Sequence, residues 1–90
     1  MMILAYDIRE DDLRNRFNKF IRQYGRRLQF SVYEISNSER ILSIVKLEIR
    51  ESFEKEFQQS DSVLIFEVNN PEKVIRFGYA KNEEDDLVFG

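Results

Sequence analysis

The sequence predicts one domain of the α+β class, built from two helices and four or five strands. Its length of 90 residues suffices for one compact core and is too short for two. Two stretches carry apolar residues at helical spacing, and short apolar runs of strand character flank them. Elements mixed in this way indicate a sheet with helices on one face, in a single domain over residues 1–90.

The first two expected elements are a strand and a helix. Residues 2–8 form a short apolar run that ends in a charged cluster, which is typical of a buried strand opening into a polar loop. Asp11 or Asp12 is placed to cap the next helix, and Gly25 is placed to terminate it. The apolar positions of this helix are Leu13, Phe17, Phe20, Ile21 and Tyr24.

A bent strand and a second helix are expected next. Apolar and polar side chains alternate from Arg27 onward, and the alternation slips near Val32, which predicts a bulge or break in one long strand. Ser36 and Glu39 have the spacing of a capping box, so we expect a helix from there to about Phe57. Part of this stretch also alternates like a strand, but its cap, length and charged background favour a helix.

The last third of the chain predicts more strands. Residues 62–68 read as a buried strand, 69–71 as a turn and 74–79 as another strand. Residues 80–90 are expected to form an acidic loop that ends in a short edge strand at 87–89. The resulting order of elements makes a ferredoxin-like sandwich the natural candidate, with a mainly antiparallel sheet.

Two helices cover only one face of such a sheet, yet two strands are apolar on both faces. Residues 3–6 and 63–66 are apolar at consecutive positions, and consecutive side chains of a strand point to opposite faces. A homodimer that packs sheet against sheet is the simplest way to cover the second face, because a two-fold interface uses the same patch twice. Pairing by the C-terminal strand would add to this contact.

Composition excludes several kinds of chemistry. The chain has no cysteine and no histidine, which rules out a disulfide framework, a thiolate zinc site, a cysteine nucleophile and an imidazole base. Its only glycines are Gly25, Gly78 and Gly90, so there is no glycine-rich phosphate loop. No apolar run is long enough to span a membrane and no signal peptide is evident, which predicts a cytoplasmic protein.

The net charge of -3 conceals a strongly segregated distribution. All 17 acidic residues lie outside residues 13–33, and four of them form the run at 83–86. A basic segment inside an acidic protein is able to contact phosphate, so nucleic acid remains a candidate ligand. The basic residues of the segment are Arg14, Arg16, Lys19, Arg22, Arg26 and Arg27.

Three motifs carry a resemblance to a known family. They are the apolar strand ending in Tyr6-Asp7-Ile8, DLRNRF at 12–17 and YGRRLQFSVYE at 24–34. Together they resemble the small spacer-acquisition protein of CRISPR systems, the second of the two near-universal CRISPR-associated protein families. The likeness extends over residues 2–79.

The resemblance implies a homodimer that bridges two dimers of a larger integrase subunit and binds double-stranded DNA during spacer acquisition. Some members of the family are metal-dependent nucleases that act on RNA or double-stranded DNA. By resemblance, Asp7 is the catalytic and metal-binding carboxylate and Tyr6 is its neighbour. The implied nucleic-acid-binding residues are Arg14, Arg16 and Arg27, while Ser31 and Tyr33 match the serine and aromatic positions of the family's second strand.

The implied metal is Mg²⁺, which accepts one or two carboxylates together with water and phosphate oxygens. One Asp7 is too little for such a site, so we expect one Mg²⁺ shared between the two Asp7 side chains of the dimer. The metal would lower the pKa of a bound water and so supply a nucleophile without histidine. The alternative is that Asp7 caps the next helix or pairs with an arginine.

For several other residues, a functional role and a purely structural role are both considered. Arg27 suits a phosphate contact and a dimer ion pair equally well, whereas Lys19 and Arg22 are expected on a solvated helix face. Ile44 and Leu47 form either an apolar stripe for a partner or part of the dimer. Aromatic residues expected in the core or an interface, rather than stacked on bases, are Tyr6, Phe30 and Tyr33.

Three functions are therefore compared. The first is a non-catalytic DNA-bridging subunit of an integration complex, and the second is a metal-dependent endonuclease. The third is a toxin-type metal-dependent endoribonuclease of the virulence-associated D kind. We expect the first function, and the sequence does not separate it from the second because one basic segment serves both.

Overall fold

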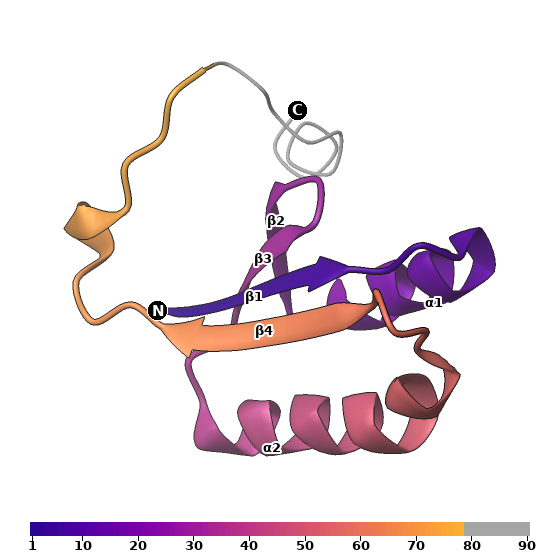
Figure 1. The fold of residues 1–90 in the computed structure, drawn as a ribbon. Helices are drawn as coiled ribbons and strands as arrows, with labels where there is room; N and C mark the ends of the chain where they lie inside the picture. The colour runs from indigo at the N-terminus through magenta and orange to yellow at the C-terminus, as the bar shows by residue number, and fades with distance from the viewer. Residues whose placement is uncertain (79–90) are drawn as a thin grey trace.

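The computed structural model describes residues 1–78 and contains a four-stranded antiparallel sheet with helices on one face (Figure 1). The strands lie in the order β2-β3-β1-β4, which is the ferredoxin-like arrangement expected from the sequence. The helix α1 follows β1, and α2 follows β3. The elements are β1 (Met2–Asp7), α1 (Asp11–Ile21), β2 (Gly25–Gln29), β3 (Val32–Ile35), α2 (Glu39–Glu48) and β4 (Ser62–Glu67).

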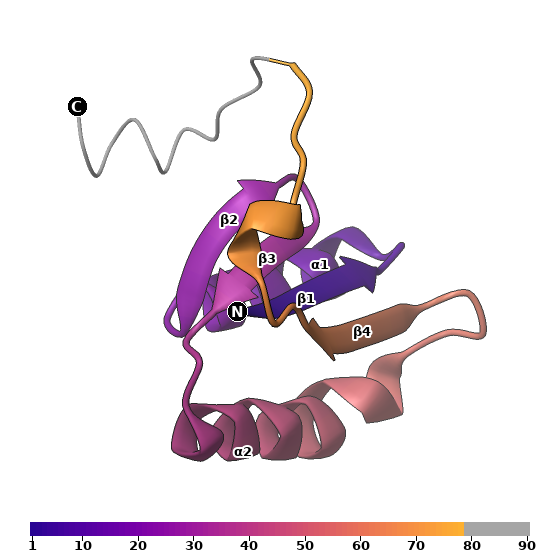
Figure 2. The ribbon, with the colours of Figure 1, turned by 90° about the vertical axis from the view of Figure 1, so that its left-hand side faces the viewer.

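The core lies between the sheet and its helices. Leu4 and Tyr33 are register partners on β1 and β3, and both are fully buried. The ring of Phe17 from α1 meets that of Phe53 edge to face, with centroids 5.1 Å apart, so the two helical stretches also pack on each other. Figure 1 shows α2 alongside β4, and Figures 1 and 2 show the β2–β3 hairpin turned relative to β1 and β4, as sheet twist requires.

Both helices begin at positions other than the expected ones. Glu10 caps α1, because its longer carboxylate accepts hydrogen bonds from the N–H groups of Asp12 and Leu13, each at 2.9 Å. The expected caps Asp11 and Asp12 lie inside the first turn, where negative charge favours the helix dipole. Ser38, not Ser36, caps α2.

The second helix reaches nearly as far as expected. After α2 the chain continues as a π-helical turn over Ile49–Phe53 and a 3-10 turn over Glu54–Glu56. The expected end at about Phe57 is therefore confirmed. The π-helical turn brings Phe53 into the core.

The expected single bent strand is wrong, because residues 25–35 form a hairpin. Gln29 pairs with Val32, so Phe30 and Ser31 make a two-residue turn just before the expected break. A register shift between Arg27 and Gln29 accounts for the slipped alternation.

Gly25 does not terminate α1 but begins β2. A Cβ there would overlap the backbone carbonyl of Glu34 on β3, so a glycine is required for the two strands to approach each other.

The expected strand at 74–79 is not formed over its described part, since residues 74–77 are irregular. The chain leaves the sheet after Val68, which exchanges two backbone hydrogen bonds with Met1, and then makes a 3-10 turn over Pro71–Lys73. A strand forms only where its backbone N–H and C=O groups hydrogen-bond to a neighbouring strand, and apolar side chains of strand character do not supply that neighbour. Tyr79, the acidic run and the expected strand at 87–89 lie outside the described residues.

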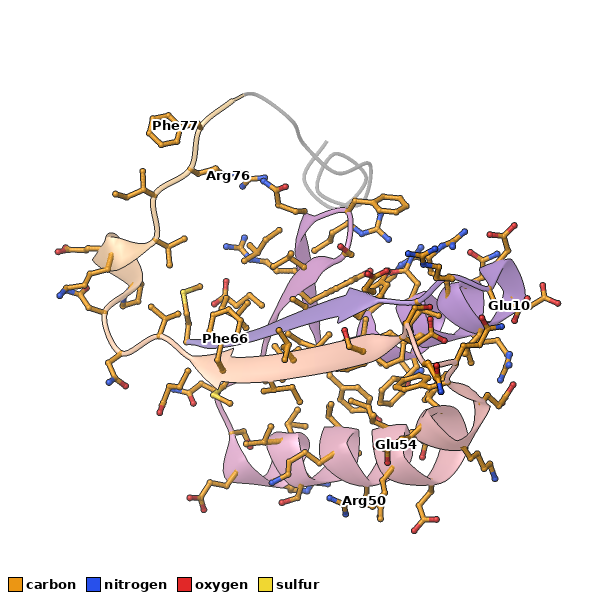
Figure 3. All side chains as sticks on the ribbon, in the orientation of Figure 1. Glu10, Arg50, Glu54, Phe66, Arg76 and Phe77 are labelled. Carbon is orange, nitrogen blue, oxygen red and sulfur yellow. The ribbon has the colours of Figure 1, made fainter. Side chains whose placement is uncertain are left out.

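The opposite side of the sheet, here called the helix-free face, consists of Ile3 and Ala5 with Leu64 and Phe66. Leu64 and Phe66 pair with Ala5 and Ile3 respectively, so all four side chains share one face. Leu64 is 63% and Phe66 is 49% exposed, and Figure 3 shows Phe66 on the side of β4 away from α2. No helix within residues 1–78 is long and apolar enough to cross a membrane.

Candidate nucleic-acid site at the end of the first strand

Asp7 is the last residue of β1, and its side chain is exposed. Because side chains alternate along a strand, Asp7 shares the parity of Ile3 and Ala5 and belongs to the helix-free face. Within residues 1–78 it takes part in no ion pair, and Glu10 occupies the helix cap. Neither structural alternative for Asp7 is therefore realised in the described chain.

An open hollow of about 530 Å³ lies beside Asp7, between the β1–α1 loop and the β2–β3 turn. The backbone N–H of Tyr6 donates to the carbonyl of Ser31 at 3.0 Å, which holds the turn against β1. The Asp7 hollow thus combines a carboxylate, two guanidinium groups, a hydroxyl group and aromatic rings. Its lining residues are Tyr6, Asp7, Ile8, Arg9, Arg14, Phe30 and Ser31.

The β1–α1 loop is held in place by side chains from two directions. The guanidinium of Arg14 donates to the carbonyl oxygens of Ile8 at 3.3 Å and Arg9 at 3.1 Å, and it pairs with Asp11 at 2.5 Å. From the other side, the Asp61 carboxylate accepts a hydrogen bond from the backbone N–H of Arg9 at 3.0 Å. Arg14 is thereby fixed at the hollow, next to Asp7.

Arg16 lies elsewhere, although it is only two residues further along α1. Residues two apart on a helix point in different directions, and Arg16 forms a bidentate ion pair with Glu56 at 2.7 and 3.1 Å. The hydrogen bond between them raises the pKa of Arg16 and lowers the pKa of Glu56. The structure therefore places Arg14 at the Asp7 hollow and uses Arg16 to join α1 to the end of the second helical stretch.

Arg27 is half-buried and engaged with aromatic side chains. Its Nε donates to the hydroxyl of Tyr33 at 3.2 Å. Its guanidinium carbon lies 5.6 Å from the ring centroid of Tyr33 and 5.9 Å from that of Phe30, which is cation–π distance. Arg27 is thus held against Tyr33 and Phe30 and is not one of the residues that line the hollow.

Tyr6 and Tyr33 are core residues, as expected. Tyr6 is 6% exposed and Tyr33 is fully buried, and their rings are stacked with centroids 6.5 Å apart. Both hydroxyl groups donate to Oδ1 of Asn18 on α1. Sequence reasoning missed Asn18, although a polar residue beside the apolar stripe of a helix is the pattern that would have indicated it.

Phe30 is not a core residue, since it is 72% exposed. Its place in a two-residue turn removes it from both faces of the sheet. The expected solvated positions are confirmed for Lys19 and Arg22, which are both exposed. On α2, Ile44 is 36% and Leu47 is 55% exposed.

The described residues around Asp7 do not by themselves complete a metal site. Within residues 1–78 no group of three or more acidic side chains is close enough to hold a metal. An exposed carboxylate at a strand end is a suitable oxygen ligand for Mg²⁺, but the site needs further ligands.

Comparison with known proteins identifies the family. The sequence matches the family described as CRISPR associated protein Cas2 over residues 1–74. A relative from Methanospirillum hungatei JF-1, described as CRISPR-associated endoribonuclease Cas2 2, is 30% identical over 67 residues, which are 74% of this chain and 71% of the relative. This chain belongs to the Cas2 family.

Solved structures carry the same fold. A hypothetical protein from Thermus thermophilus superposes with a TM-score of 0.71 at 28% identity, covering 88% of this chain and 93% of that protein. Cas2 of Streptococcus pyogenes superposes with a TM-score of 0.69 at 23% identity, covering 87% of this chain and all of that one. The likeness extends over nearly the whole sheet-and-helix arrangement of the Cas2 fold.

Proposed function

We propose that this Cas2-family chain is a homodimeric subunit for CRISPR spacer acquisition, which bridges two dimers of the larger integrase subunit and binds double-stranded DNA. The observation that carries the proposal is the apolar helix-free face, on which Leu64 and Phe66 are exposed and Asp7 lies at the edge. Exposed apolar side chains gathered on one sheet face favour a protein partner, and a second copy uses the same patch twice. Such a dimer presents two sets of arginines for a bridging role.

The proposed DNA contacts come from the basic segment. Arg14 stands at the Asp7 hollow, and Arg16 and Arg27 are held by Glu56 and Tyr33. Planar guanidinium groups with fixed orientation suit phosphate oxygens. Binding that neutralises phosphates depends steeply on salt, with a slope of about -0.9 in log K against log salt for each phosphate.

Nuclease activity is a second part of the proposal. Two Asp7 side chains would hold one Mg²⁺, which when bound supplies a water of lowered pKa for attack on phosphorus. Arg14 would orient the phosphodiester beside these carboxylates, because its guanidinium is already fixed by two backbone carbonyls. The name of the Methanospirillum hungatei relative, an endoribonuclease, favours RNA as the substrate of this activity.

The test is integration of short DNA duplexes into a CRISPR array in vitro, with the larger subunit present. Asp7→Asn keeps the shape of the side chain and removes its charge, so we expect integration to persist while Mg²⁺-dependent cleavage is lost. Cleavage that survives both EDTA and this substitution would remove Asp7 from the mechanism. Loss of integration by a folded Asp7→Asn dimer would refute a purely architectural role in bridging.

The arginines are tested by the salt dependence of duplex DNA binding. Replacing Arg14 and Arg16 by Ala should flatten the slope by about 0.9 for each lost phosphate contact. Arg50→Ala is the matched control, since Arg50 is exposed at the start of the π-helical turn and does not line the hollow. An equal slope in the double variant and wild type would place the DNA elsewhere.

The toxin-type endoribonuclease of the virulence-associated D kind is the alternative function. The family match is to Cas2 proteins, and nothing in the described chain favours the toxin over them. A gene located beside a CRISPR array and an integrase gene would exclude the alternative.

A further inference from the structure

Phe30 occupies an unusual place for a large apolar ring. It is 72% exposed in a two-residue hairpin turn, a position that polar residues and glycine normally fill. Its ring is absent from the buried core cluster and from the partly buried residues packed on it. Burial in the core therefore gives no reason for an aromatic residue here.

The ring of Phe30 is nevertheless held in a defined position. The guanidinium of Arg27 lies 5.9 Å from its centroid, and the same guanidinium is fixed by the hydroxyl of buried Tyr33. The backbone bond from Tyr6 to Ser31 anchors the turn itself. An exposed ring on a fixed support is a stacking platform prepared before any ligand arrives.

The surroundings of Phe30 are those of a nucleotide site. The ring lines the Asp7 hollow together with Arg9, Arg14 and Ser31. The volume of about 530 Å³ lies within the usual range for small-molecule sites. Aromatic rings next to cationic groups bind single-stranded nucleic acid by stacking bases and neutralising phosphates.

We infer that the Asp7 hollow binds one unpaired nucleotide, whose base stacks on Phe30 and whose phosphate faces Arg9 and Arg14. This inference rests on the proposed function, because it adds a substrate-positioning residue, Phe30, to the same site. Bases inside a duplex are already stacked on each other, so Phe30 is able to engage only an unpaired base. The hollow therefore selects single-stranded segments, while the arginines outside it contact duplex phosphates without reading pairing.

The test compares Phe30→Leu and Phe30→Trp with wild type. Leucine keeps apolar bulk and removes the ring, whereas tryptophan keeps a stacking surface. We expect Phe30→Leu to weaken binding of a short single-stranded RNA by about 5- to 150-fold, which is the usual range for one base–aromatic stack. Binding of a blunt duplex of the same sequence should be unchanged, and Phe30→Trp should restore single-strand binding.

A fluorescent base analogue gives a direct readout of stacking. A single 2-aminopurine in the RNA should be quenched on binding to wild type and to Phe30→Trp, but not to Phe30→Leu. Phe77→Leu is the matched control, because Phe77 is 89% exposed and lies outside the hollow (Figure 3). This control should behave as wild type in both measurements.

The outcomes separate the two proposals. If wild type binds duplex DNA and Phe30→Leu leaves single-strand binding unchanged, the stacking inference fails and the proposed function stands. If wild type binds neither nucleic acid, both fail. If Phe30→Leu dissociates the dimer or weakens duplex binding equally, Phe30 is an interface residue and the stacking inference is overturned.

Discussion

The two faces of the sheet are similarly apolar but differ in exposure. On the covered face, Leu4 and Tyr33 are fully buried beneath the helices, whereas Leu64 and Phe66 on the helix-free face are 63% and 49% exposed. Ile3, on the central strand β1, is only 5% exposed although it lies on the helix-free face. Within residues 1–78, the position of the helices, and not strand composition, decides which face of the sheet is covered.

The largest expected effect comes from the covered face. Phe17→Ala removes a fully buried ring that contacts Tyr6, Phe20 and Phe53, so it should lower the free energy of unfolding by about 3–5 kcal/mol. Urea unfolding at one fixed protein concentration measures this, because the stability of a dimer depends on concentration. A loss below about 1 kcal/mol would contradict a rigidly packed covered face.

A substitution on the helix-free face should weaken association of the two protomers and leave the fold of each protomer intact. Leu64→Glu places a charge on the proposed dimer interface. Burying one large apolar side chain stabilises an interface by about 1.5–3 kcal/mol. The two-fold axis brings two copies of Leu64 into the interface, so the loss of association free energy is doubled. We expect wild type to scatter light at twice the 10.9 kDa protomer mass and the variant at the protomer mass, with its circular dichroism retained.

Leu47→Glu is the matched control for that experiment. Leu47 is 55% exposed, but it lies on α2 and not on the helix-free face. It should leave the dimer intact. Dissociation by Leu47→Glu and not by Leu64→Glu would move the interface to the helices and overturn the comparison of the two faces.

The order of elements and the amphipathic helices could be predicted from the sequence, because periodicity is a local signal. The β2–β3 hairpin could not, since Phe30 and Ser31 lack the glycine, asparagine or proline that marks a turn. The strand at 74–79 was predicted from side chains alone, but a strand also requires a neighbour, which no local pattern supplies.

The candidate site was also predictable only in part, because sequence motifs identify residues but not the direction in which the fold turns them. Resemblance pointed to Asp7 and Arg14, and the structure brings both to one hollow. It also pointed to Arg16, which the helix turns toward Glu56 instead. The exposure of Phe30 depends on tertiary packing, which no local pattern reports. The place of Asn18 beside the apolar stripe of α1 is visible in the sequence, but its two tyrosine partners are set by the fold.

A smaller effect is expected at the polar contact within the covered side. Asn18→Ala removes the acceptor shared by the hydroxyl groups of Tyr6 and Tyr33, and a buried polar group left unpaired costs about 1–3 kcal/mol. Urea unfolding measures the loss of stability. Tyr6→Phe in the Asn18→Ala background should recover part of it, since the hydroxyl that donated to Asn18 is then gone. No recovery would show that Asn18 stabilises the protein by another contact.

The smallest effect belongs to the exposed ion pair that joins the two helical stretches. The Arg16 guanidinium holds the pKa of the Glu56 carboxyl below its ordinary value, so the folded chain binds this proton less readily than the unfolded chain. The contribution to stability is therefore present above the ordinary pKa of a glutamate and is lost as pH falls through the lowered one. Solvent and salt screen an exposed pair, which keeps the contribution small.

Glu56→Gln should accordingly lower the urea midpoint slightly at neutral pH, and the difference from wild type should close in acid. Glu51→Gln controls for the change in net charge, since Glu51 is an exposed glutamate of the same helical stretch that forms no ion pair within residues 1–78. Its midpoint should follow wild type across the pH range more closely than that of Glu56→Gln. A Glu56→Gln difference that is constant from neutral to acid pH would show that packing, and not charge, joins the end of the second helical stretch to α1. The two helical stretches would then be joined by apolar contacts such as the Phe17–Phe53 ring pair, and the charge of the Arg16–Glu56 pair would add nothing to the stability of the covered face.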